Sequence, residues 1–86
     1  MIRAAIAIGS NSTRLLVADK QGNELKNIYR GREETRLFLG LDDEGFIAKE
    51  RLDFTAQAVA GMAEEARTRG AKEIALFATI ANEYQY

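Results

Sequence analysis

A short polar turn between two apolar segments is the part of this sequence best suited to chemistry. The turn is Gly9-Ser10-Asn11-Ser12, with Ile6-Ala7-Ile8 before it and Thr13-Arg14-Leu15-Leu16-Val17 after it. Backbone N–H groups, hydroxyls and an amide gathered at one tight turn form a donor set of the kind that binds phosphate oxygens. The side chain just before the turn is the methyl group of Ala7, which cannot hold a metal ion or accept a proton. The turn therefore predicts phosphate binding more strongly than it predicts a reaction.

Three extended segments are expected to position this turn. Residues 2–8 alternate along the chain, and their apolar face consists of Ile2, Ala4, Ile6 and Ile8. Residues 13–19 are almost continuously apolar, which predicts a second strand. Residues 24–37 form a longer third segment, in which Gly31 is a candidate β-bulge.

A helix is predicted from about Ala48 to Arg69, with Gly70 as its C-terminal cap. The stripe expected to be buried recurs at helical spacing: Leu52, Ala56, Val59, Ala63 and Ala66. A fourth strand is predicted over residues 72–79, and its centre, Ile74–Ala78, is apolar on both faces. Because a helix connects it to the earlier strands, this strand should lie parallel to residues 2–8. The fold class is therefore α/β, a mixed sheet of order third-second-first-fourth with one helix packed on one face.

Composition limits the functions open to the chain. Its 86 residues predict a single small domain spanning 1–86. The sequence has no Cys and no His, and so lacks thiolates as well as the commonest metal ligand and general base. The 12 Lys and Arg residues nearly balance the 13 Asp and Glu residues, which argues against a nucleic-acid partner and a membrane partner. No apolar run is long enough to cross a membrane and no signal peptide is evident, so a cytoplasmic location is expected.

The segment Ile8–Asp19 resembles the opening of the exopolyphosphatase / guanosine pentaphosphate phosphohydrolase family. Thr35-Arg36-Leu37, the Asp42–Gly45 turn and Phe77-Ala78-Thr79 follow in that family's order and spacing. The resemblance implies the actin-like, ribonuclease-H-like fold. This chain would then be a single truncated N-terminal subdomain, about half of one lobe.

The same resemblance carries implications for the site. It implies a parent activity that uses magnesium to remove terminal phosphate from polyphosphate or guanosine pentaphosphate. It implies that Gly9, Ser10, Asn11 and Ser12 form a phosphate-binding loop, and that Arg36 lies beside the same cleft. Both features also have plain structural explanations, because Gly, Asn and Ser favour hairpin turns and an arginine on a strand is commonly just solvated.

Several departures from the family pattern argue against activity. The family carries Asp where Ala7 stands, Gly where Phe38 stands and Ser where Ile80 stands. Its catalytic glutamate and second glycine-rich phosphate loop fall beyond residue 86. We therefore expect no catalytic residue, no metal site and no cofactor, so that this chain is not an enzyme.

Three functions stay open. The first is a catalytically inactive fragment, engineered or truncated, that folds and self-associates, with a homodimer favoured. The second is a small module that binds phosphate or a nucleotide weakly through Gly9–Ser12. The third is a working phosphatase acting on polyphosphate or guanosine pentaphosphate.

Self-association is expected because a single helix covers only one face of the sheet and leaves a free edge. The predicted contact residues are the large apolar side chains Phe38, Phe54, Ile80, Tyr84 and Tyr86. A lone exposed Phe54 is also unremarkable on a soluble protein, so this surface stays a hypothesis at the level of sequence.

Overall fold

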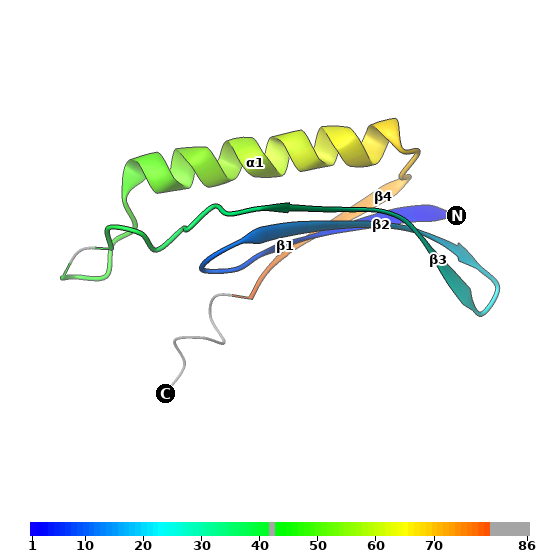
Figure 1. Cartoon of the computed structure of the whole chain (residues 1–86), viewed down its shortest axis with the longest axis horizontal. Coiled ribbons are helices and arrows are strands. Elements are labelled where there is room, and N and C mark those ends of the chain that lie inside the picture. The colour runs from blue at the N-terminus through cyan, green and yellow to red at the C-terminus, as the bar shows by residue number, and fades with distance from the viewer. Residues whose placement is uncertain (42, 80–86) are drawn as a thin grey trace.

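The computed structural model describes residues 1–41 and 43–79, which form a four-stranded sheet and one helix (Figure 1). The strands are β1 (Ile2–Ile8), β2 (Thr13–Gln21), β3 (Glu24–Glu33) and β4 (Glu73–Ala78), and the helix α1 is Lys49–Thr68. The sheet order is β3-β2-β1-β4, with β1 antiparallel to β2 and parallel to β4. The predicted fold class and strand order are confirmed. The predicted contact residues Ile80, Tyr84 and Tyr86 lie outside the described residues.

The core lies between α1 and one face of the sheet. Figure 1 shows α1 running along this face, and no described element covers the opposite face. Alternation along the strands sends every second side chain toward the helix, as predicted for residues 2–8. The buried cluster consists of Ala4, Ile6, Leu15, Val17 and Ala66.

The buried stripe of α1 differs from the predicted one. Ala66 is buried, and Val59 and Ala63 pack against the core, but Leu52 is 48% exposed and Ala56 is also exposed. Leu52 belongs to the first turns of α1, which project past the end of the strands (Figure 1). Thr55, the residue before the predicted Ala56, is buried instead.

The C-terminal end of α1 is closed as predicted, by Gly70. Its φ is +92°, a left-handed conformation that glycine adopts without strain. The Gly70 N–H donates to Arg67 O (2.9 Å) and the Ala71 N–H donates to Ala66 O (3.0 Å), the bond pattern of a Schellman motif. The Lys72 N–H then donates to Ile2 O (2.9 Å), which starts the pairing of β4 with β1.

The β-bulge lies at Ile28, so the prediction of a bulge at Gly31 is wrong. Val17 pairs with Tyr29 while Ala18 pairs with Asn27, which leaves Ile28 as the extra residue. Gly31 stays in register, and its lack of a side chain makes room for an aromatic ring. A Cβ there would lie 3.3 Å from Cε2 of Tyr29. The ring packs against the core cluster and carries the guanidinium of Arg69, 4.0 Å from its centroid.

The fourth strand lies at the edge of the sheet, as the predicted order required, and most of its apolar side chains are exposed. Leu76 is 56% exposed on the face that α1 covers elsewhere, and Phe77 is 50% exposed on the opposite face. Only Ile74 packs against the core cluster from this strand. The physical reason is position: β4 is an edge strand, and a single helix lies over the central strands β1 and β2.

The third extended segment ends at Glu33, before its predicted end at residue 37. The chain leaves the sheet there because Thr35 is buried and residues 37–40 form a turn. Among the described residues, no helix is both long enough and apolar enough to cross a membrane.

Candidate functional site

The Gly9–Ser12 turn joins β1 to β2 and is closed by its own backbone. The Gly9 N–H donates to Ser12 O at 2.9 Å. A Cβ at Gly9 would lie 3.1 Å from that same oxygen, so a side chain there would push the turn open. The Gly9 N–H is therefore used inside the turn and is not available to a ligand, which narrows the donor set expected from the sequence.

The segment after β3 is fixed against this turn. The Arg36 N–H donates to Asn11 O at 3.0 Å, and the hydroxyls of Thr13 and Thr35 lie 2.9 Å apart with both residues fully buried. Arg36 has φ +46°, the one positive φ of a non-glycine residue in the described part of the chain. Such a conformation costs roughly 1–2 kcal/mol. These bonds hold the predicted Arg36 beside the predicted loop.

A cavity of about 350 Å³ opens at the turn. It is lined by Ala7, Gly9, Ser10, Asn11, Ser12, Arg14, Arg32 and Thr79. All four predicted loop residues are thus brought together at one cavity. Two arginines that were not predicted as site residues, Arg14 and Arg32, complete its lining.

A second cavity of about 590 Å³ adjoins the first. Its lining comprises Ser10, Asn11, Arg32, Glu34, Arg36, Phe38 and Leu39. Arg36 therefore lies near the loop residues Ser10 and Asn11, but it lines the second cavity and not the first. The carboxylate of Glu34 lines the second cavity as well. Ser10, Asn11 and Arg32 line both cavities.

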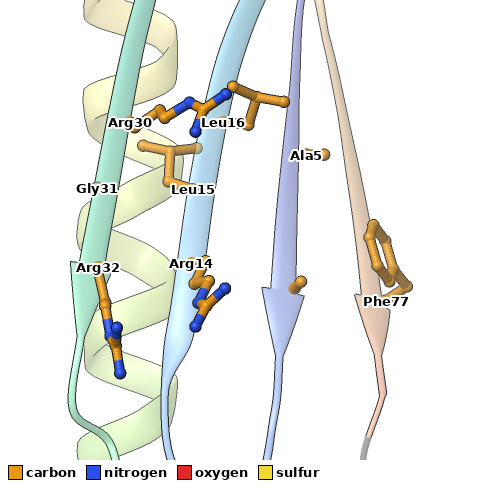
Figure 2. Close-up of a pocket in the computed structure, with 9 residues that line it drawn as sticks. Ala5, Arg14, Leu15, Leu16, Arg30, Gly31, Arg32 and Phe77 are labelled. Carbon is orange, nitrogen blue, oxygen red and sulfur yellow. The ribbon is translucent and has the colours of Figure 1, made fainter.

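The positive charge of the site comes from neighbouring strands. Arg14 of β2 pairs directly across from Arg32 of β3, and both side chains point toward the end of the sheet that bears the turn (Figure 2). Two like charges in a cross-strand pair repel each other. Arg32 is relieved by an ion pair with Glu34 (2.8 Å), whereas the described residues offer Arg14 no ion pair. An incoming anion would remove the remaining repulsion.

Magnesium, which the family resemblance implies, does not fit this cavity. No carboxylate lines it, because Ala7 presents a methyl group, and two arginines face it instead. Protein-bound Mg²⁺ is usually held by one or two carboxylates together with phosphate oxygens. Within residues 1–41 and 43–79, no group of three or more acidic or histidine side chains could hold a metal ion. The described lining of this cavity thus offers guanidinium, hydroxyl and amide groups but no carboxylate.

The two predicted contact residues that the structure describes lie in different places. Phe38 is half-buried and lines the second cavity beside Arg36. Phe54 is 37% exposed on α1, and the guanidinium carbon of Arg51 lies 4.9 Å from its ring centroid. None of the four cavities described is lined by both Phe38 and Phe54.

The chain is similar in structure to Ppx/GppA proteins. The Aquifex aeolicus PPX-GPPA enzyme matches with a TM-score of 0.82 and 26% identity, over 91% of this chain and 26% of that chain. An exopolyphosphatase from Cytophaga hutchinsonii matches with a TM-score of 0.84 and 17% identity, over 91% of this chain and 25% of its own. An exopolyphosphatase-like protein matches with a TM-score of 0.82 and 24% identity, over 95% of this chain and 25% of its own. No protein-family model and no curated protein matches.

These matches confirm the resemblance at the level of fold. The chain spans about a quarter of the length of the solved structures it matches, consistent with an N-terminal half-lobe.

Proposed function

We propose that this chain, which has the fold of a Ppx/GppA half-lobe, binds phosphate through the Gly9–Ser12 turn and two arginines without hydrolysing phosphate esters or anhydrides. The observation that carries the proposal is the cavity at the turn, which is lined by Ser10, Asn11 and Ser12 together with Arg14 and Arg32. Charge-assisted hydrogen bonds from guanidinium groups to phosphate are among the strongest polar contacts that proteins make.

The arginines supply most of the expected affinity. Arg14 and Arg32 are exposed, and their cross-strand repulsion is already part of the folded state. A phosphate between them would replace repulsion with two attractive contacts. Because water screens exposed charges, we expect weak binding, with a Kd of about 1 mM.

Inactivity is proposed from the chemistry of the lining. Removing terminal phosphate requires a group that activates water and a means of neutralising developing charge. The arginines can provide charge, but no side chain lining the cavity can accept a proton at neutral pH. Ala7 stands where a carboxylate would be needed.

Isothermal titration with inorganic phosphate tests binding. We expect saturable binding that weakens about three- to ten-fold in Arg14→Gln and in Arg32→Gln, because each loses a charged hydrogen bond. Arg67→Gln on the outer face of α1 is the matched control and should bind as the unmodified chain does. Unchanged affinity in both site variants would refute the site.

Incubation with polyphosphate and magnesium tests the absence of hydrolysis. Phosphate release should equal that of a sample without protein, and Ala7→Asp should restore no turnover by itself, because the described cavity still lacks a second acid–base group. Release well above the blank by the unmodified chain, free of contaminating phosphatase, would establish the third function considered for the sequence.

Self-association is a second candidate function, favoured by the exposure of β4. Its residues 74–78 carry no charge, whereas the other edge strand, β3, carries Lys26, Arg30 and Arg32 together with a bulge. Charged residues and bulges protect edge strands from pairing with another chain. We expect light scattering to give twice the 9.6 kDa mass of one chain, and Leu76→Lys to return the mass to a monomer. A monomeric mass for the unmodified chain at micromolar concentration would contradict this candidate.

A further inference from the structure

The second cavity of the candidate site lies directly beside the cavity proposed to bind phosphate. Both cavities are lined by Ser10, Asn11 and Arg32. The second cavity has a volume of about 590 Å³, within the range of about 300–1,000 Å³ that is typical of small-molecule sites. A phosphate held at the Gly9–Ser12 turn would therefore have space beside it for an organic group attached to one of its oxygens.

The second cavity presents a carboxylate and a guanidinium that can both bind hydroxyl groups. Glu34 forms an ion pair with Arg32 through Oε1 (2.8 Å). An ionised carboxylate has about four lone-pair positions, so Glu34 can accept further hydrogen bonds. Within the described part of the chain, Arg36 takes part in no ion pair. Because a hydroxyl both donates and accepts, neighbouring hydroxyls of one ligand can satisfy both side chains.

The backbone between Glu34 and Arg36 is held in place by its neighbours. Thr35, which separates them, is completely buried, and its carbonyl oxygen accepts a hydrogen bond from Arg51 Nη1 (3.1 Å). The Arg36 N–H donates to Asn11 O (3.0 Å). The carboxylate and the guanidinium are therefore placed beside the turn before a ligand binds. This reduces the loss of chain entropy that binding would otherwise require.

Other organic groups match this lining less well. A second phosphoryl group would face the Glu34 carboxylate, and like charges repel each other. A purely apolar group would take Glu34 and Arg36 out of water without giving either of them a hydrogen bond, which costs free energy. A ring that carries several hydroxyls offers polar groups to these two residues and C–H groups to Phe38 and Leu39, which also line the cavity.

We propose that the two cavities together bind a phosphate monoester of a polyhydroxylated compound, such as a sugar phosphate. The phosphate lies at the turn with Arg14 and Arg32, and hydroxyls of the organic group donate to Glu34 and accept from Arg36. The inference rests on the phosphate binding proposed above, and it adds the chemical class of the group attached to the phosphate. Glu34 is then the residue that determines which organic group is bound.

NMR titrations of the backbone amide shifts of the full chain test the proposal, because they measure weak binding directly. Glucose 6-phosphate is compared with ethyl phosphate at about pH 8, where both esters carry two negative charges. We expect glucose 6-phosphate to bind about three- to ten-fold more tightly, as one or two additional hydrogen bonds would provide. Equal binding of the two esters would overturn this proposal and leave phosphate binding at the turn intact.

Substitution of Glu34 separates recognition of hydroxyls from a structural effect. Glu34→Gln should at least halve the ratio of the two affinities, because a neutral amide accepts hydrogen bonds more weakly than a carboxylate. The same variant should bind ethyl phosphate at least as tightly as the unmodified chain, because Arg32 no longer pairs with Glu34. A structural defect would weaken both esters. Glu24→Gln, at the other end of β3 and outside both cavities, is the matched control. An unchanged ratio in Glu34→Gln would overturn the assignment.

Three further outcomes would also overturn the proposal. Tighter binding of hexyl phosphate than of glucose 6-phosphate would mean that the second cavity takes an apolar group. Tighter binding of pyrophosphate would mean that it takes a second phosphoryl group. If neither inorganic phosphate nor any of these esters shifts the amides of the Gly9–Ser12 turn, the phosphate site itself is refuted, and the sugar phosphate proposal fails with it.

Discussion

Replacing one of the two buried threonines behind the candidate loop should destabilise the chain more than replacing both. The hydroxyls of Thr13 and Thr35 lie 2.9 Å apart, and both residues are completely buried. Valine has the same shape and branching, so Thr35→Val leaves no cavity and only strands the Thr13 hydroxyl. A buried hydroxyl that loses its hydrogen bond costs about 1–3 kcal/mol. Thr13→Val should cost a similar amount for the same reason.

The double variant removes both hydroxyls, so no buried polar group is left without a hydrogen-bond partner. With two apolar groups in contact, the net change should be within about 1 kcal/mol of zero. The interaction energy of the cycle, which is the change in the double variant minus the changes in the two single variants, is therefore expected to be about −2 to −6 kcal/mol. Against a total stability of about 4–13 kcal/mol for a chain of 86 residues, either single variant is a substantial loss.

Urea unfolding followed by circular dichroism measures all four corners of this cycle. The single variants should also lower the melting temperature by roughly 4–8 °C for each kcal/mol lost. Thr68→Val is the matched control, because that exposed hydroxyl donates to Glu64 O at 3.0 Å and water can replace the bond. If the losses of the two single variants simply add in the double variant, the hydroxyls are not coupled and the reasoning about this contact is wrong.

Two other predictions concern stability. Thr55 is buried on α1, and its hydroxyl has no hydrogen-bond partner among the described residues, so Thr55→Val should raise the free energy of unfolding by about 1 kcal/mol in urea titrations; a decrease would show that the hydroxyl is satisfied. The hydrogen bond from the Met1 ammonium, followed by that from Gln21, holds the pKa of Asp19 below its ordinary value. The stabilisation is therefore complete above the ordinary carboxyl range and is lost as the pH falls through the lowered pKa. Asp19→Asn should flatten this acid limb in unfolding curves measured at several pH values, and an unchanged limb would contradict the pairing.

The fold could be predicted because its signals are local. Alternation at Ile2, Ala4 and Ile6 fixes the face of β1, and the short turns and the long helical connection fix the strand order. The buried side of α1 could not be fixed in the same way. Helical periodicity places Leu52 and Ala66 on the same face of α1, but only Ala66 lies over the sheet and is buried. The predicted order placed β4 at an edge, but the exposure of Leu76 and Phe77 depends on where the single helix lies, which an apolar run does not indicate.

The sequence predicted the loop residues Gly9–Ser12 of the candidate site, but it did not predict that Arg14 and Arg32 line the same cavity. Gly9–Ser12 could be identified from turn chemistry and from the family resemblance. Arg14 and Arg32 lie 18 residues apart, and only the pairing of β2 with β3 makes them neighbours. One signal was present: once the Glu24–Glu33 strand is assigned, alternation places Arg30 and Arg32 on the same face. The register that places Arg32 opposite Arg14 depends on the bulge at Ile28, which the sequence does not reveal.

The parallel pairing of β1 with β4 gives this sheet an order of assembly. β1, β2 and β3 meet through two short turns, but the bond from the Thr79 N–H to Ile8 O (2.8 Å) joins residues 71 positions apart. Contacts across such a span form late, because the chain must first lose the entropy of a long loop. Phe77 therefore takes its place beside Ala7 of β1 in the last step of folding. Any contact that holds β4 against β1 therefore stabilises only the finished sheet, and it draws the slowest-forming strand toward the folded state.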